Sequence, residues 1–216
     1  MTDFADFKTQ IMEWQNREDW SDVLVTSFVS MAEQKFNQEL RVSRMIVTAE
    51  NTVNCRCAEL PDDWLEMTLL SIAVPTPPSG YPGWTPGGWR PIRYKSRDEF
   101  FKLPDKWALN HYTIEGRTVF FGGTPDAING TKFLMSYYGE VPVFTDIQPS
   151  WLYTKYPSIF LSAAMMHAYM HAVGEEQQAA GAKQLTEDGI QKLNDEWKLA
   201  KASGSRLTRS RHRSFG

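Results

Sequence analysis

The chain has 216 residues, of which 42% are hydrophobic and 23% are charged, and its formal net charge at pH 7 is −3. These are ordinary values for a globular protein, and a chain of this length can build a core without metal or disulfide staples. The small net charge gives no sign of nucleic-acid binding, and the longest apolar stretch, Ile159 to Val173, is too short and too polar to span a bilayer.

The first forty residues predict two helices. Apolar residues recur at helical spacing at Phe4, Phe7, Ile11 and Trp14. Ser21 is expected to cap a second helix. The apolar stripe of that helix is Val25, Val29, Ala32, Phe36 and Leu40, with Leu24, Phe28 and Met31 beside it. We therefore expect an N-terminal helical hairpin over Asp3 to Leu40.

The chain from about residue 42 to 145 predicts a small antiparallel β module of about six strands, because apolar residues there alternate with period two. The expected strands are 53–58, 67–72, 89–94, 112–115, 118–121 and 132–138. Glu115-Gly116-Arg117 is the expected hairpin turn. A short helix is expected over Ser96 to Leu103, capped by Ser96. Cys55 and Cys57 lie on one expected strand, as reduced thiols rather than a zinc site or a disulfide.

One long loop interrupts this module. Pro75 to Pro91 contains six prolines and four glycines in seventeen residues, which disfavours both helix and ladder strand. Tyr81, Trp84 and Trp89 lie within it, and exposed aromatic residues are enriched at protein interfaces. We expect an interface loop here, and the alternative is a carbohydrate- or ligand-binding module that uses the same three aromatic residues.

Two further helices are predicted after residue 150. The first runs from about Ser150 to Gly174, with an apolar face of Tyr156, Ile159, Phe160, Ala163, Met166, Met170 and Val173. The second, about 175 to 202, is polar, and its stripe is Leu185, Ile190, Leu193, Trp197 and Ala200. Gly181 and Gly189 weaken it by roughly 1 kcal/mol each and permit a bend. Ser203-Gly204-Ser205 is expected to end it.

The last fourteen residues, 203–216, hold four arginines, one histidine and no acid, whereas the first 202 carry 19 Lys and Arg against 26 Asp and Glu. So polar a segment cannot bury enough apolar surface to fold alone, and it is expected to be a flexible, extended basic tail. The fold class is therefore α+β: one domain over 1–202, with N-terminal and C-terminal helical hairpins packed as a bundle, a central antiparallel β module, and the tail.

Motifs for catalysis or metal binding are weak, and we expect neither an enzyme nor a bound cofactor or metal. His167 and His171 have the i, i+4 spacing of zinc ligands, but Ala168 stands where a metalloprotease helix has glutamate. Packing histidines are expected, with a metal-dependent hydrolase as the alternative. Asp62 and Asp63 follow Pro61 and are expected to form a turn rather than a catalytic dyad.

Six phrases, taken in order, carry a family resemblance: WQNREDW, AEQKFNQELR, AELPDDWLEM, YTIEGRTVFF, SYYGEVP and WLYTKYPSIFLSAAMMHA. This succession resembles the head-to-tail adaptor proteins of short-tailed bacteriophages. The resemblance implies a structural virion protein of the neck or tail, assembled in the host cytoplasm. Such adaptors form a ring, typically of twelve copies, beneath the portal; the ring extends the DNA channel and docks tail components.

The resemblance also implies partners for particular residues. The C-terminal segment is expected to bind the portal protein through Arg206, Leu207, Arg209, Arg211, Arg213 and Phe215. Contact of these arginines with DNA phosphates, or a merely solvated end, are the alternatives. The other implied partners are further copies of the chain, tail nozzle or tail-fibre proteins, and genomic DNA that passes without sequence-specific binding. No membrane is implied.

Overall fold

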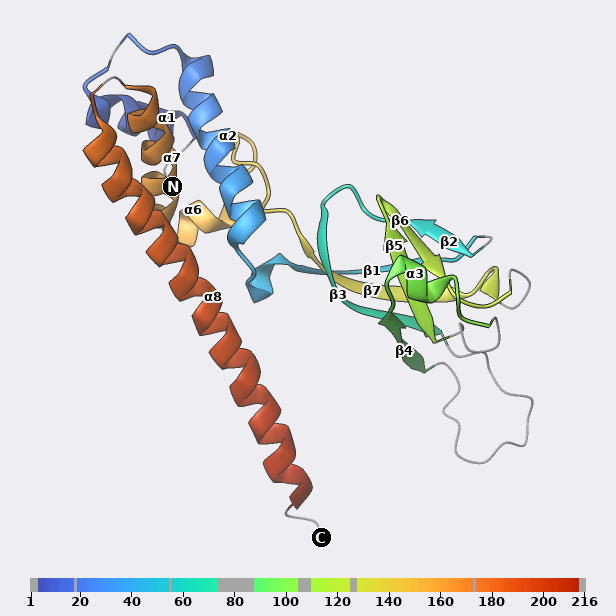
Figure 1. The fold of residues 1–216 in the computed structure, drawn as a ribbon. Coiled ribbons are helices and arrows are strands. Elements are labelled where there is room, and N and C mark those ends of the chain that lie inside the picture. Colours follow the sequence, from blue (N-terminus) through green and yellow to red (C-terminus); the bar gives the residue numbers. More distant parts are fainter. Residues whose placement is uncertain are drawn as a thin grey trace. The chain divides into compact units, whose positions relative to one another are not determined.

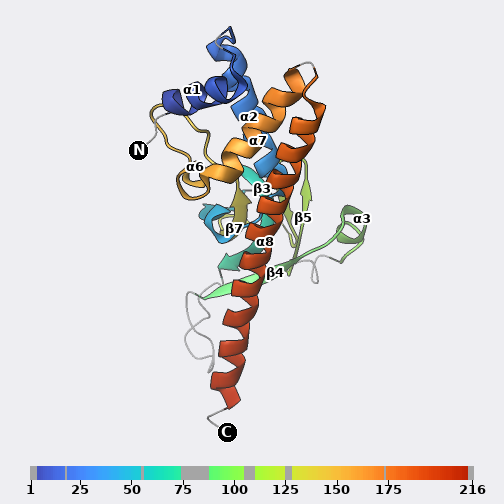
Figure 2. The same ribbon diagram turned by 90° about the vertical axis from the view of Figure 1, so that its left-hand side faces the viewer.

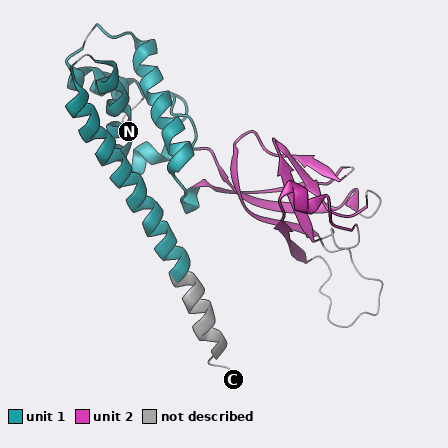
Figure 3. Ribbon diagram, viewed as in Figure 1, with its two compact units in different colours: residues 1–44, 141–216 teal, residues 45–140 magenta. Residues whose placement is uncertain are grey.

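The computed structural model describes residues 4–17, 19–54, 56–73, 88–104, 110–124, 128–172 and 174–213, and for 203–213 it describes only the backbone. The chain divides into two compact units (Figure 3). The helical unit contains Met1–Arg44 and Val141–Gly216, and the β unit contains Met45–Glu140. The predicted α+β class is confirmed, with the strands inserted between two sets of helices.

The helical unit consists of five helices among its described residues (Figure 1). They are α1 (Phe4–Gln15), α2 (Asp22–Glu39), α6 (Trp151–Lys155), α7 (Pro157–His171) and α8 (Glu176–Arg213). Ser21 caps α2 as predicted, because its Oγ accepts a hydrogen bond of 3.3 Å from the Leu24 N–H. Helix α7 packs against α8, α2 and α1.

Aromatic side chains form the centre of the helical unit. The ring of Phe160 in α7 lies 5.5 Å from that of Phe7 in α1 and 5.3 Å from that of Phe36 in α2. Phe144, in the segment that enters the unit after the last strand, stacks on Tyr153 at 5.0 Å. The predicted α2 stripe is buried throughout, whereas Met31 beside it is exposed.

The single helix predicted from Ser150 to Gly174 is two helices. Tyr156 separates α6 from α7 with φ −134° and ψ 58°, because the following Pro157 disfavours the α conformation in the residue before it. Pro157 itself occupies the first turn of α7, where its missing N–H costs nothing. Helix α7 ends at His171, and Gly174 turns the chain with φ +85°.

The end predicted for the last helix at Ser203 is wrong, because α8 continues as one helix from Glu176 to Arg213. Ser203-Gly204-Ser205 costs on the order of 1 kcal/mol of helix propensity, but no proline follows, and arginine and leucine are good helix formers. The α8 backbone therefore replaces the expected extended chain as far as residue 213. Gly189 has a packing role: a Cβ there would lie 2.8 Å from Ile159 Cγ1 of α7.

The β unit holds a seven-stranded mixed sheet in the order β1-β7-β3-β4-β5-β6-β2. The strands are β1 (Ile46–Thr52), β2 (Cys57–Glu59), β3 (Trp64–Ala73), β4 (Trp89–Tyr94), β5 (His111–Glu115), β6 (Thr118–Phe121) and β7 (Lys132–Gly139). A 3-10 turn over Ser43–Met45 precedes β1, and α3 (Arg97–Phe100) lies between β4 and β5.

Most of the strands and the β5–β6 hairpin were predicted, but the parallel pairing of β4 with β5 was not. Strands β4 and β5 are parallel, which corrects the antiparallel module. The connection between them contains α3 and is long enough to return the chain in the same direction. Pro91 is part of β4, so the predicted loop is shorter at this end. Within the described residues β5 pairs with β4 at Arg93 and Tyr94 and not at Pro91, so the missing N–H of the proline breaks no described ladder bond to β5.

The strand predicted over 53–58 is wrong in its first half. Arg56 has φ +76° and turns the chain, so β2 begins only at Cys57, and β1 over Ile46–Thr52 is an additional strand. Cys57 is a free, half-buried thiol, and Cys55 lies outside the described residues. The predicted β5–β6 hairpin is confirmed, with Gly116 at φ +57° in its two-residue turn.

The predicted short helix is confirmed as α3, but it is shorter than expected and Ser96 makes no side-chain capping hydrogen bond. The core of the β unit lies on one face of the sheet. Its fully buried members include Val53, Val119 and Phe133. No helix in the described part of the chain is long and apolar enough to cross a membrane.

Candidate interaction surfaces

The arginine-rich segment is carried by α8. Leu193 is buried against the helical unit, whereas Leu199 is exposed one and a half turns later. Both ribbon views show α8 running on past the other helices of its unit (Figures 1 and 2). The side chains of Arg206, Leu207, Arg209, Arg211 and Arg213, and all of Phe215, lie outside the described residues. The portal-binding prediction therefore remains a prediction.

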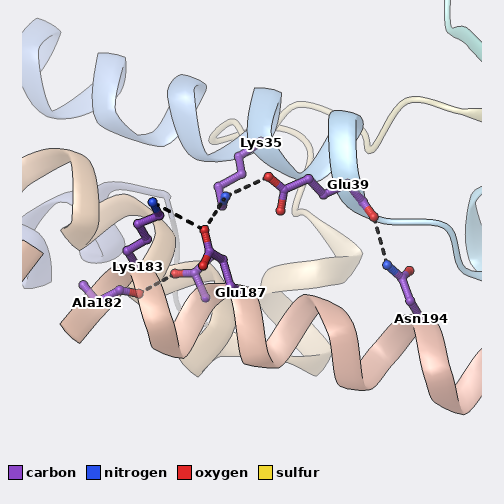
Figure 4. Close-up of polar contacts among 7 residues, drawn as sticks. Lys35, Glu39, Ala182, Lys183, Glu187 and Asn194 are labelled. Atoms are coloured by element: carbon purple, nitrogen blue, oxygen red, sulfur yellow. Dashed lines mark hydrogen bonds and ion pairs between the residues drawn. The ribbon is translucent and has the colours of Figure 1, made fainter. Parts of the chain in front are cut away.

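Asn194 fastens the middle of α8 to the end of α2 (Figure 4). Its Nδ2 donates to the Glu39 carbonyl at 2.9 Å, and its Oδ1 accepts from the Arg41 N–H at 2.7 Å. The last carbonyls of a helix have no partner within the helix, so this one side chain satisfies part of the α2 terminus. It also fixes the register of α8 against α2.

A row of charges continues this contact towards the start of α8 (Figure 4). The Nζ of Lys35 in α2 lies 2.8 Å from Glu39 Oε1 and 3.7 Å from Glu187 Oε1 of α8. The Nζ of Lys183 lies 3.9 Å from the same Glu187 oxygen. The Lys35 side chain is largely buried, so its pairing with two carboxylates is less screened than that of a surface ion pair. Together with Asn194, these pairs link the first half of α8 to α2, while the main packing of α8 is against α7.

The two histidines of α7 have different surroundings. Burial lowers the pKa of His167, and the charge of Lys35 lowers that pKa further. Its Nε2 is buried and has no hydrogen-bond partner within the described residues. His171 lies against the rings of Trp20 and Phe28, at 6.0 and 5.6 Å. Over the described ranges, no group of three or more His, Cys, Asp and Glu is placed to hold a metal ion.

The acidic pair at the start of β3 forms the predicted turn. The Trp64 N–H donates to the Pro61 carbonyl at 3.2 Å, and β3 begins there. Asp62 is ion-paired with Arg117, and Asp63 accepts a hydrogen bond of 3.0 Å from the Tyr137 hydroxyl. Burial, with a smaller contribution from Asp63, raises the pKa of Tyr137 to about 12. Each of the two aspartates therefore has a structural role in this turn, through its own partner in the β unit.

The aromatic loop is only partly described. Trp89 lies at the beginning of β4, is paired with Ala73, and is exposed. Tyr81 and Trp84 lie outside the described residues. Of the three aromatic residues only Trp89 is therefore described, and the interface loop stays a prediction.

An apolar groove on the helical unit was not predicted. It encloses about 430 Å³, and its lining includes Trp14, Leu161, Met165, Tyr169, Ala182 and Leu185, from the end of α1, from α7 and from α8. Trp14 is 61% exposed and Leu185 is 66% exposed, although both stand on stripes that predict burial. None of the lining residues is charged. The large exposed fractions of these two side chains show that they line a surface groove and not the core, and sequence periodicity cannot reveal such exposure.

Comparison with known proteins assigns nearly the whole chain to one protein family. None of the curated proteins compared matches it. The sequence model of the SU10 adaptor protein family matches residues 2–213, which is nearly the full length. That range covers both units and most of the basic segment of α8. The chain therefore belongs to the SU10 adaptor protein family, a family of head-to-tail adaptors of bacteriophages.

Proposed function

We propose that this chain is a structural adaptor of the phage neck, which forms a ring beneath the portal, extends the DNA channel and docks tail components. The family match over residues 2–213 is the observation that carries this proposal. The role needs interaction surfaces and no catalytic group. By the resemblance to adaptors of short-tailed phages, the ring has about twelve copies and the docked partners are tail nozzle or tail-fibre proteins.

The geometry of α8 supports the portal as the partner of its C-terminal end. Asn194 and the Lys35–Glu187 pair hold the first half of the helix on its own subunit. The second half leaves the packed region and carries the four arginines. Arg206, Arg209 and Arg213 have the i, i+3, i+7 spacing of one helical face. Such a face fits a row of carboxylates. Leu207, one residue after Arg206, lies on another face of the helix, and Phe215 lies outside the described residues, so these two apolar anchors are proposed separately from the arginine face.

The charge distribution supports a channel through which DNA slides. Outside the last fourteen residues the chain is acidic, with 19 Lys and Arg against 26 Asp and Glu. A channel lined by subunits with this net negative charge would repel phosphate and release no counterions on contact, so it would not hold passing DNA. The basic segment is the exception, which is why its partner has to be tested directly.

The test is binding to purified portal rings of the same phage, followed by sedimentation and electron microscopy. The full chain is expected to bind and to form a ring beneath the portal. A variant with arginines 206, 209, 211 and 213 changed to glutamine should lose most of this binding, and the matched four-lysine variant should keep more of it. Loss of binding in high salt would agree with charge pairing.

The alternative partner, DNA, is distinguished in the same samples. If the glutamine variant binds portal as well as the wild type but loses affinity for duplex DNA, then the arginines contact phosphate and not the portal. The body must remain folded in every variant, and an unchanged melting temperature shows this. A chain that never binds portal rings contradicts the proposed function itself.

A further inference from the structure

A turn on the helical unit presents an isolated apolar side chain. Ile147 is 96% exposed, the highest exposed fraction among the large apolar side chains of the described residues. The turn around it is well built: the Thr145 N–H donates to the Gln148 carbonyl at 3.0 Å, and the Gln148 N–H donates to Thr145 Oγ1 at 3.1 Å. Val143, the first residue of this Val143–Ile147 turn, is exposed as well.

Hydrogen bonds to α2 hold the backbone of the turn. The N–H of Phe144 donates to the buried Glu33 carboxylate at 2.6 Å, and the N–H of Val141 donates to Asn37 Oδ1 at 2.8 Å. The Phe144 ring is inserted among those of Phe4, Phe7, Tyr153 and Phe160. The backbone on both sides of Ile147 is therefore fixed, and a segment with a preformed backbone loses less conformational entropy when it binds than a flexible one.

The turn and the apolar groove lie on opposite sides of the helical unit. Phe144 contacts Phe4 at the beginning of α1, whereas Trp14 of the groove stands ten residues later, about 15 Å along the helix. Both ribbon views show the same separation: the gold 141–150 segment lies on one side of the unit and the first half of α8 on the other (Figures 1 and 2).

The uncharged lining of the groove suits an apolar occupant better than a charged one. Its lining has no charged side chain, so the arginine-rich segment would leave its guanidinium groups unpaired there. Val143 and Ile147 are uncharged and exposed, and Asp146 at the tip of the turn can stay in water at the rim. A volume of about 430 Å³ accommodates both apolar side chains.

We propose that the apolar groove of each copy receives the Val143–Ile147 turn of the neighbouring copy. A projection on one side and a matching recess on the opposite side make a head-to-tail contact, and such contacts generate rings when their rotation closes. This inference rests on the proposed ring function, and it names the surfaces that join adjacent subunits.

Disulfide trapping tests the contact in assembled rings. In a background with Cys55 and Cys57 changed to serine, one protein carries Ile147→Cys and a second carries Leu185→Cys. Equal amounts are assembled on portal rings and oxidised. Covalent dimers are expected from the mixture and not from either protein alone. A chain that carries both substitutions should give a ladder of oligomers.

The matched control replaces Ile147→Cys with Val23→Cys. Val23 in the first turn of α2 is also highly exposed but is not part of the turn, so mixtures of Val23→Cys with Leu185→Cys should give no dimers. Rings that are visible by electron microscopy but give no Ile147–Leu185 cross-link overturn this inference and leave the ring function standing. Cross-linking of Leu185→Cys with itself overturns it too, because the contact would then be symmetric. Wild-type protein that forms no ring overturns both.

Discussion

The Glu33 carboxylate in α2 accepts a 2.6 Å hydrogen bond from the backbone N–H of Phe144, although Glu33 is only 6% exposed. Burial raises the pKa of this carboxyl from 4.5 to about 7, and the hydrogen bond from Phe144 opposes part of that rise. The pair ties the segment that follows β7 to the helical unit, and it makes the stability of the unit depend on pH.

Changing Glu33 to glutamine should remove a pH-dependent loss of stability. The folded-state pKa lies above the unfolded value, so the folded state binds more protons between pH 4.5 and 7, and stability falls as pH rises through that window. The loss is at most about 3 kcal/mol. Urea unfolding at pH 4.5 and pH 8 should show that the free energy of unfolding of the variant, relative to that of the wild type, is higher at pH 8 than at pH 4.5. An equal difference at both pH values would contradict the assignment.

Asn194→Ala should destabilise the protein by about 1 to 3 kcal/mol, because it leaves the Glu39 carbonyl and the Arg41 N–H without the partner that bridges them. Asn194→Asp keeps the acceptor and loses the donor, so it should fall between alanine and the wild type. Lys198→Ala serves as the control, since Lys198 is exposed and its ion pair among the described residues, with Asp195, lies within α8. Hydrogen exchange in α8 should speed up in Asn194→Ala, and unchanged exchange would show that the contact is not needed.

Gly189 and Gly181 offer a matched pair in one helix. A Cβ at Gly189 would lie 2.8, 2.9 and 3.3 Å from three carbons of Ile159, whereas a Cβ at Gly181 meets nothing within 4 Å. Gly189→Ala should therefore cost about 1 to 3 kcal/mol through overpacking. Gly181→Ala should stabilise α8 by up to about 1 kcal/mol. Thermal unfolding measures both, and a stabilised Gly189→Ala would show that α7 and α8 move apart freely.

Helices were the most predictable part of this fold. The stripes of α1 and α2 repeat every three to four residues, and Ser21 marks the start of α2 with a side chain that can cap it. Local boundaries were less predictable. The break at Tyr156 depends on Pro157, and the continuation of α8 past Ser203 depends on a balance of propensities in which no single residue decides.

Strand pairing beyond the local β5–β6 hairpin, and the exposure of side chains, could not be predicted from one sequence. The parallel pairing of β4 with β5 depends on how the connection through α3 returns to the sheet, and local periodicity does not encode that. Trp14 and Leu185 occupy stripe positions as buried residues do, and only the tertiary arrangement leaves them lining a groove. Asn194 was missed for the same reason, since its partners Glu39 and Arg41 lie more than 150 residues away.

Electron microscopy of the purified chain mixed with portal rings of the same phage shows whether the chain assembles beneath the portal. We expect a closed ring of this chain stacked coaxially on the portal, with the end of α8 reaching the portal subunits. Portal rings that remain bare at saturating concentrations of folded protein would contradict this expectation.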